Sequence, residues 1–276
     1  MTYKSIIIFC LWLCIGCGNK MVPTTASVSS KDETTSGLRV LSYNIHHANP
    51  PSKPNVIDIS AVANVIKQQQ PDLVALQEVD VYNNRSGKTV HEAAEIAKQS
   101  GMPYYFFGKG IDYEGGEYGI AILSKYPISS TTNNPLPTEK STGGEHRTLV
   151  TAMVTLPQGK KIIFACTHLD AQSKDTNRFL QINKIVELLE KKKYPLIIAG
   201  DFNAVPSSRI INELDKHFTR TCITGCAFTI TAVNPISTID YIAYRPTDKF
   251  TVTECKVIDE KYASDHLPIL AVLKIK

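Results

Sequence analysis

The sequence predicts an α/β domain in which packed β-sheets carry helices on their outer faces. Short apolar runs, rich in β-branched residues and bounded by Gly, Pro or Asn, alternate with amphipathic stretches from Leu38 to Ile275. Neither an internal repeat nor a Pro/Gly/Ser-rich linker interrupts this region of the sequence. The chain has 276 residues, of which 43% are hydrophobic and 20% charged. This composition supplies a large core and excludes general disorder, so we predict one domain.

Nine strands are predicted, and they require at least one large sheet. In chain order they are Leu38–Tyr43, Leu73–Gln77, Tyr104–Phe107, Gly119–Ser124, Leu149–Thr155, Lys161–Thr167, Leu196–Gly200, Ile239–Tyr244 and Pro268–Leu273.

Helices are predicted between several of these strands. Residues 56–69 have a helical apolar pattern that stops before Pro71, and residues 91–99 follow. Residues 176–192 form an amphipathic stretch with a Lys-rich end, which suits the negative end of a helix dipole. A shorter helix is expected to start near Ser207.

The N-terminus is predicted to lie outside the domain. Residues 1–17 combine a basic start, the short apolar run 5–15 and Gly16–Cys17, which is the pattern of an export signal. Cys17 follows a segment that resembles a bacterial lipobox, so we expect a lipid-anchored protein of the bacterial cell envelope, with a cleaved, secreted form as the alternative. Residues 18–37 are polar and are predicted to be a flexible tether, followed by a domain over residues 38–276.

Four cysteines remain after the export signal. Cys222 and Cys226 are close enough in sequence to pair, and either could pair with Cys255. A disulfide, buried thiols and a metal site stay open as interpretations, whereas Cys166 lies in an apolar strand and is predicted to be core.

The charge of the chain identifies no partner. A net charge of +4 is too small to indicate a dedicated nucleic-acid or membrane-surface coat. The basic run Lys191–Lys193 lies at a predicted helix end and not beside the polar motifs described next, which disfavours a nuclease without excluding it.

Polar side chains stand where the predicted strands end or begin. Four strands end at Asn44, at Gln77–Glu78, at His168 and at Asp201, which Asn203 follows. Two later strands are preceded instead by polar residues, Asp240 and the pair Asp265–His266. If these two strands run antiparallel to the first four, all these groups meet at one rim of the sheets.

The types of these residues indicate the chemistry. Carboxylate and amide oxygens suit a hard divalent cation such as Mg²⁺ or Mn²⁺. A carboxylate can take a proton from water, and an imidazole can donate to phosphoryl oxygens. The residues therefore predict metal-assisted hydrolysis of a phosphate ester.

Six strings carry a resemblance to the endonuclease/exonuclease/phosphatase superfamily. The resemblance covers the chain from Leu38 onward and implies a four-layered α/β sandwich, two face-to-face mixed β-sheets flanked by helices, with a divalent metal, usually Mg²⁺. The strings, in order, are Ser42–Ile45, Gln77–Val79, Thr167–Leu169, Gly200–Asn203, Ile239–Tyr241 and Ser264–Pro268.

The resemblance also implies roles for single residues. Glu78 is similar to the principal metal ligand of the family, with Asn44 and Asp265 near the metal or bridged to it by water.

On the phosphate side, the resemblance implies that Asp201 aligns or deprotonates the nucleophilic water and that Asn203 holds a phosphoryl oxygen. His266 would contact the phosphate, oriented by Asp240. His168 matches an imidazole of the secreted deoxyribonuclease and sphingomyelinase branches.

Two arginines have open interpretations. Arg147 is either a surface ion-pair residue or a phosphate ligand at the rim, since a guanidinium suits phosphate oxygens. Arg85 lies in a polar loop and could reach a substrate head group or remain solvated. Of the neighbours His46 and His47, we expect only one to face the pocket.

The sequence thus predicts a metal-dependent phosphoesterase, with a phosphodiester favoured, at the cell envelope. The substrate could be a lipid head group, a nucleic acid or another phosphoester, and the membrane would be reached through the N-terminal lipid anchor. A non-specific secreted-type nuclease and a non-catalytic module that binds a phosphorylated ligand are the alternatives. We expect a monomer without an obligate protein partner.

Overall fold

The computed structural model describes Met1 and residues 37–276, and the latter form one compact unit. The predicted export signal and tether fall on residues outside this description, apart from Met1 and Gly37. None of the helices in the described part has the length and apolar character needed to cross a membrane.

The first sheet has six strands and one parallel pair, β1 with β2. Its strands, in spatial order, are β11 (Phe250–Val257), β12 (Ile269–Ile275), β1 (Leu38–Asn44), β2 (Leu73–Val81), β4 (Gly116–Ser124) and β3 (Tyr104–Tyr113).

The second sheet also has six strands and one parallel pair, β7 with β8. Its strands, in spatial order, are β5 (Ile128–Pro135), β6 (Thr148–Thr155), β7 (Lys161–His168), β8 (Leu196–Asp201), β10 (Asp240–Arg245) and β9 (Thr219–Arg220).

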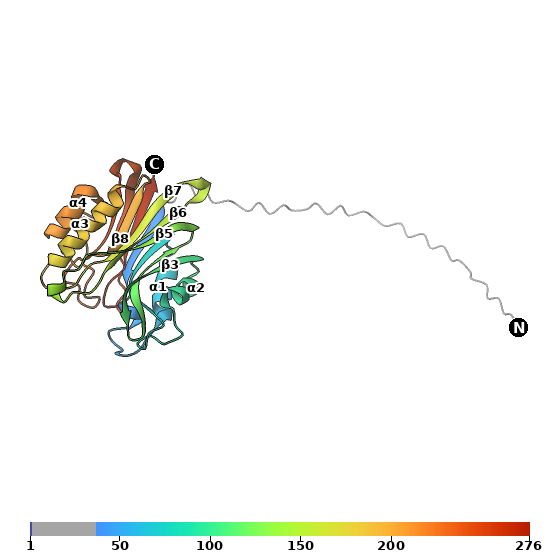
Figure 1. The fold of residues 1–276 in the computed structure, drawn as a ribbon. Helices are drawn as coiled ribbons and strands as arrows, with labels where there is room; N and C mark the ends of the chain where they lie inside the picture. Colours follow the sequence, from blue (N-terminus) through green and yellow to red (C-terminus); the bar gives the residue numbers. More distant parts are fainter. Residues whose placement is uncertain (2–36) are drawn as a thin grey trace, which may run out of the picture. The chain divides into compact units, whose positions relative to one another are not determined.

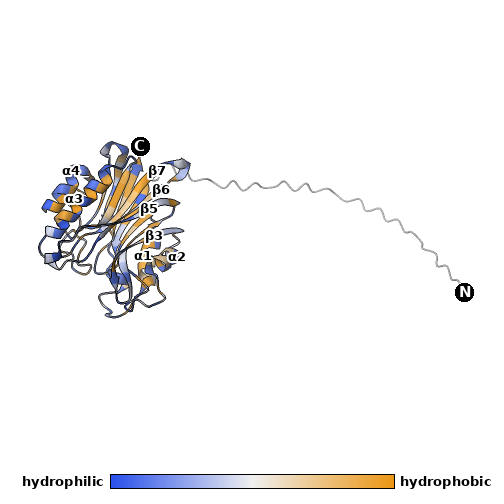
Figure 2. Ribbon diagram, viewed as in Figure 1, coloured by the Kyte–Doolittle hydropathy of each residue, from blue (hydrophilic) through white to orange (hydrophobic). Residues whose placement is uncertain are grey.

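Helices cover the outer face of each sheet, which gives four layers (Figure 1). One apolar cluster fills the space between the two sheets, including Val40 of β1 and Phe164 of β7. A second packs α1 (Ile59–Gln69) and α2 (Glu92–Ser100) on the first sheet, and a third packs α3 (Thr176–Glu190) and α4 (Arg209–His217) on the second. Figure 2 shows the apolar residues concentrated in the strands. The predicted α/β sandwich, two mixed sheets flanked by helices, is confirmed.

Short 3₁₀ turns complete the described elements. They are His46–Ala48, Lys140–Thr142, Pro157–Gly159 and Thr247–Lys249.

Three strands were not predicted, and each lies at the edge of a sheet. β5 is largely polar and β9 has only two residues, while the apolar alternation of Phe250 and Val252 in β11 ends at Glu254, where its pairing with β12 shifts. Edge strands need little apolar surface, so their sequences lack the runs that mark central strands.

The prediction for β2 was wrong at its end. The strand continues to Val81 instead of stopping near Gln77, and its pairing with β4 shifts by one residue between Gln77 and Val79. Glu78 occupies this β-bulge with a φ of 60°, in the left-handed region. A bulge redirects a side chain, which explains how a mid-strand Glu78 can point to the rim.

The strand directions gather the polar motifs at one end of the sandwich. β10 runs antiparallel to β8 and β12 antiparallel to β1, which meets the condition set by the sequence. We call this the site end; the starts of β1, β7 and β8 lie at the opposite end.

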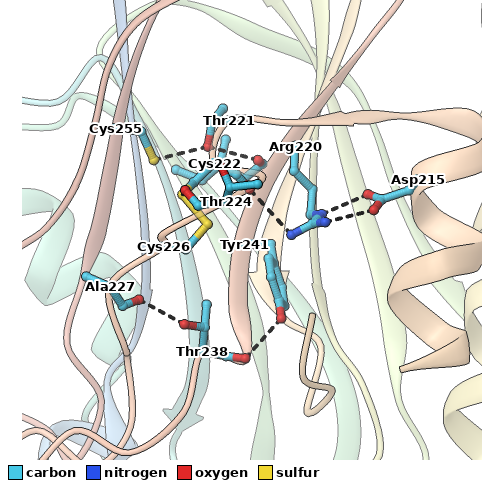
Figure 3. Close-up of a disulfide and its surroundings, with 11 residues drawn as sticks. Asp215, Arg220, Thr221, Cys222, Thr224, Cys226, Ala227, Thr238, Tyr241 and Cys255 are labelled. Atoms are coloured by element: carbon cyan, nitrogen blue, oxygen red, sulfur yellow. Dashed lines mark hydrogen bonds and ion pairs between the residues drawn. A yellow bond between two sulfur atoms is a disulfide. The ribbon is translucent and has the colours of Figure 1, made fainter. Parts of the chain in front are cut away.

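A disulfide joins Cys222 to Cys226 in the segment between β9 and β10 (Figure 3). Cys166 and Cys255 are free thiols, and Cys166 is fully buried, as predicted. The segment continues to the site end, where the Ala232 amide donates to the Asp265 carbonyl.

Candidate active site

Asp201, the last residue of β8, lies at the centre of the polar cluster and is 1% exposed. Asn44 Nδ2 donates to its Oδ2 at 3.1 Å, and the same oxygen lies 3.5 Å from His168 Nε2 and 3.8 Å from His266 Nε2. Its Oδ1 accepts from the Asn203 amide at 2.8 Å. Residues from both sheets therefore meet on one carboxylate.

The environment of Asp201 favours its protonated form. Burial raises the pKa of Asp201, and the nearby charge of Asp240 raises it further, to about 7. A carboxyl with this pKa can exchange a proton near neutral pH.

His266 is held by Asp240, the first residue of β10. Its Nδ1 lies 3.0 Å from Asp240 Oδ2, and its backbone amide donates to Ser264 Oγ. Burial lowers the pKa of His266, but the charge and hydrogen bond of Asp240 outweigh burial and raise it to about 10. His266 is therefore a cation at neutral pH in this arrangement.

His168, at the end of β7, has the opposite character. Arg147 Nη1 donates to its Nδ1 at 3.2 Å, and the side-chain nitrogen Nδ2 of Asn203 lies 3.1 Å from Nε2. Burial and the charge of Arg147 hold the pKa of His168 well below its ordinary value. The site thus contains one charged and one neutral imidazole.

Glu78 approaches from the first sheet. Asn44 Nδ2 donates to Glu78 Oε1 at 3.0 Å, and His47 Nδ1 lies 3.8 Å from Oε2. Burial would raise the pKa of Glu78, yet the nearby His47, the hydrogen bond from Asn44 and the charge of His266 lower it well below its usual range. Glu78 is therefore an anionic carboxylate.

Only one of the two neighbouring histidines turns its side chain toward the site, as predicted, although the His46 backbone amide donates to Asn44 Oδ1. His47 faces Glu78, while His46 Nδ1 bonds to the Asn49 carbonyl at 2.9 Å.

The carboxylate oxygens of the cluster fit a divalent cation. Among the described residues, one group with metal-ligand spacing is Asp201, Asp240 and His266, whose ligand atoms lie within 4.8 Å of one another. Asp240 Oδ1 is buried and has no hydrogen-bond partner, as an unused ligand oxygen would be. Carboxylate oxygens suit Mg²⁺ and Mn²⁺.

This group differs from the predicted ligands Glu78, Asn44 and Asp265. Asn44 links Glu78 to Asp201, so these two predicted ligands border the group. Asp265 Oδ1 accepts from Ser264 Oγ at 3.4 Å and lies next to His266 in sequence.

The two predicted arginines have different surroundings. Arg147 is buried beside His168 and pairs with Glu145 at 2.9 Å. The Arg85 guanidinium instead donates twice to Asp80, at 2.8 and 2.9 Å, and lies over the ring of Tyr113. The geometry places Arg147 in the cluster and commits Arg85 to the loop after β2.

A buried acidic pair behind the bulge was missed by the sequence analysis. Glu92 Oε2 accepts from the Asp80 amide, and Ser86 Oγ contacts both carboxylates, at 2.7 and 2.8 Å. Burial and the charge of Asp80 raise the pKa of Glu92 to about 8. The sequence signal for this pair was Asp80, an acidic residue between Val79 and Val81 of β2.

Comparisons with known proteins agree with this geometry. The model of the Endonuclease/Exonuclease/phosphatase family matches residues 41–266. YbhP of Escherichia coli K12 is 25% identical over 253 residues, covering 86% of this chain and 96% of its own length.

Solved structures show the same fold. An endonuclease/exonuclease/phosphatase from Beutenbergia cavernae superposes with a TM-score of 0.74 at 26% identity, over 87% of this chain and 72% of the other. A mannosyl-6-phosphatase of Bacteroides thetaiotaomicron superposes with a TM-score of 0.67 at 18% identity, over 86% and 99%. With a buried Asp/His cluster at the rim of two packed sheets and a family model matched over most of its length, the chain belongs to the Endonuclease/Exonuclease/phosphatase family of phosphoester hydrolases.

Proposed function

We propose that this protein hydrolyses a phosphodiester by direct attack of water, with Mg²⁺ or Mn²⁺ as cofactor. The observation that carries the proposal is the single carboxylate oxygen of Asp201 that Asn44, His168 and His266 surround. This arrangement combines an anionic base with cationic and neutral hydrogen-bond donors around one point.

Asp201 acts as the base. Its pKa of about 7 matches proton transfer from water near neutral pH, and the Asn203 amide fixes the orientation of the carboxylate. His266, charged and oriented by Asp240, donates to a phosphoryl oxygen and stabilises the charge that develops there.

His168, Asn203 and Arg147 hold the other side of the phosphate. Arg147 Nη1 contacts His168 Nδ1, and His168 Nε2 faces Asp201 Oδ2 and Asn203 Nδ2 on the side where the substrate would bind. Arg147 would also contact the phosphate, whereas Arg85 is held by Asp80 and takes no part in the reaction.

Glu78, Asn44 and Asp265, beside the Asp201–Asp240–His266 group, would hold the cation. When bound, the cation neutralises phosphate charge and polarises the ester. Asp201 belongs to this group and accepts a hydrogen bond from Asn44, so the proposed base would lie beside the residues that would hold the cation.

The preference for a diester rests on charge. Arg147 is paired with Glu145, and His266 with Asp240, so little positive charge in the described site is left uncompensated. A diester carries one negative charge and a monoester approaches two near neutral pH, so the site suits the diester better. Export to the cell envelope as a lipoprotein, acting as a monomer, completes the proposal.

The test compares bis(p-nitrophenyl) phosphate with p-nitrophenyl phosphate, with Mg²⁺ and with a chelator. Plasmid DNA, RNA, sphingomyelin and phosphoinositides extend the panel. We expect metal-dependent cleavage of the diester that Asp201→Asn and His266→Ala reduce by about 10³-fold.

Matched controls are Asp248→Asn and His217→Ala, which lie away from the motifs. Full activity of the site variants would exclude the proposed mechanism. If the monoester reacts faster, the proposed substrate class becomes a phosphomonoester, as the name of the mannosyl-6-phosphatase that shares the fold indicates for that protein. Tight binding without turnover would favour the non-catalytic module.

A further inference from the structure

The end of the domain opposite the site carries a dense group of lysines. Four segments meet there: residues 156–161, 190–195, 246–250 and 274–276. They contain eight exposed lysines and two acidic residues, Glu190 and Asp248. We call this group the basic end; its lysines are Lys160, Lys161, Lys191, Lys192, Lys193, Lys249, Lys274 and Lys276.

Contacts between the two sheets place these segments together. Lys160 Nζ, before β7, donates to the carbonyl of Ile275 in β12 at 3.3 Å. The Lys276 amide donates to the Lys249 carbonyl at 2.9 Å. The run Lys191–Lys193 leads into β8, whose first residue pairs with Ile163 of β7.

The basic end contains a cavity with mixed chemistry. A cavity of about 300 Å³ lies between the end of α3 and the outer face of β5–β7, lined by Lys191, Lys192, Lys193, Met153, Ile163 and Tyr194, among others. Tyr194 is 45% exposed. An aromatic ring with a polar tip beside lysines is typical of a membrane–water interface.

The helix end does not account for this charge. The dipole of α3 places about half an elementary negative charge at its C-terminal end, which is less than the charge of three lysines. The charge of Lys191 acts weakly on Glu187, whereas the ion pairs of residues 37–276 include none with Lys192 or Lys193, so most of this charge is available to a partner.

The position of the basic end also identifies its partner. β1 starts at this end with Leu38, directly after the polar segment that precedes the domain. The seven residues of β1 span about 20 Å before Asn44 reaches the site. A nucleic-acid substrate bound at the basic end would lie too far from the catalytic groups to be cleaved. A membrane surface beside the start of β1 does not have to reach those groups.

We propose that the basic end docks on an anionic lipid surface, with the site end turned away from it. Lysines attract lipid phosphates within about 10 Å of the membrane, and Tyr194 lies at the level of the head groups. This orientation does not depend on the reaction proposed above. A lipid anchor at Cys17, as proposed above, would hold the domain near the membrane, while the lysines set which end faces it.

Residues 37–276 can be tested alone, because they contain all the described strands and helices and the three apolar clusters. The probe is co-sedimentation with vesicles of phosphatidylcholine, with or without phosphatidylglycerol, at low and high salt. We expect binding only to the anionic vesicles and release by salt.

The variant Lys191→Gln/Lys192→Gln/Lys193→Gln is compared with Lys88→Gln/Lys140→Gln/Lys174→Gln, which removes the same charge from exposed lysines outside the basic end. We expect the first to bind roughly 10- to 100-fold more weakly and the second to change binding less than about threefold. Equal losses would show an effect of net charge and overturn the proposal. Stronger binding to duplex DNA than to anionic vesicles would do so too.

A fluorescence reporter tests the orientation. The chain has one tryptophan, Trp12, so residues 37–276 have none. Tyr194→Trp then gives a single reporter at the basic end, and Phe228→Trp, at a position 50% exposed in the loop before β10, gives one near the site end. We expect a blue shift on anionic vesicles for Tyr194→Trp alone; a shift confined to Phe228→Trp would show docking through the site end.

Discussion

The two sheets repeat one connectivity, although the sequence shows no repeat. In the first sheet β1, α1, β2, α2, β3 and β4 follow one another, and in the second β7, α3, β8, α4, β9 and β10 do so. In both sheets the second strand of the final hairpin lies in the middle and the first lies at the edge. The spatial orders are β2–β4–β3 and β8–β10–β9. The two halves of the molecule therefore offer equivalent strand ends to the same site.

Different side chains occupy these equivalent ends. In the first sheet Asn44 pairs in register with Gln77, followed by Glu78; in the second, His168 pairs with Asp201. Glu78 has a lowered pKa and Asp201 a raised one. One backbone arrangement thus places an anionic carboxylate on one side and a carboxyl with a raised pKa on the other; under the proposed mechanism, the first would bind the cation and the second would accept the proton.

The sharpest test of this separation compares Glu78→Gln with Asp201→Asn. We expect Asp201→Asn to lower kcat about 10³-fold at every Mg²⁺ concentration, because the base is lost. Glu78→Gln should lower activity about 10²-fold at low Mg²⁺ and recover in part as Mg²⁺ rises. The measurement is kcat against Mg²⁺ concentration; identical responses would contradict a division between the sheets.

The helices that follow β2 and β8 differ in the charge and burial of their first residues. α2 begins with buried Glu92, and α4 with exposed Arg209. The folded-state pKa of Glu92, about 8, exceeds its unfolded value, so its contribution to stability is complete below the unfolded pKa. That contribution is lost as pH rises through about 8.

We therefore expect the free energy of unfolding to fall by about 3 kcal/mol between pH 5 and 8 through this group. Glu92→Gln should remove most of this slope, because the amide keeps an acceptor for the Asp80 amide without ionising. Chemical denaturation across this pH range checks it. Glu114→Gln, at an exposed position, should leave the slope as it is, and an unchanged slope in Glu92→Gln would refute the assignment.

The two arginines offer a further contrast between the halves. Arg147→Ala should lower kcat/KM about 30-fold with little loss of stability, because it removes the donor that orients His168. Arg85→Ala should leave kcat/KM within about threefold but lower stability by about 2 kcal/mol, because buried Asp80 loses its partner. Paired kinetic and unfolding measurements decide; the reverse pattern would restore Arg85 as a substrate ligand.

The smallest effect concerns the disulfide, which has no counterpart in the first sheet within the described residues. Cys222→Ser/Cys226→Ser should lower stability by about 1 to 2 kcal/mol, since the bridge closes a short loop. Figure 3 shows the bridge beside the Arg220–Asp215 pair and Tyr241, which hold this region independently. Denaturation with and without reductant measures the loss, and wild-type values for the variant would mean that the bridge is dispensable.

The sequence predicted the central strands and the residues that meet at the site, because buried strands need continuous apolar runs and polar residues at their ends stand out. It did not predict β5 or β11, whose edge positions leave their patterns weak. The bulge at Glu78 was also missed, since one extra residue in a strand depends on the partner strand β4. Likewise, the Arg85–Asp80 pair depends on a loop path that local sequence does not specify.

The position of β12 determines when the site can form during synthesis of the chain. The last strand of the chain lies between β11 and β1, so the first strand lacks its neighbour until residues 269–275 arrive. The same final segment brings His266 to Asn44, which is 222 positions earlier in the sequence. A chain still under synthesis therefore has no assembled site until residues 266–275 have been added, and the proposed activity can begin only after that.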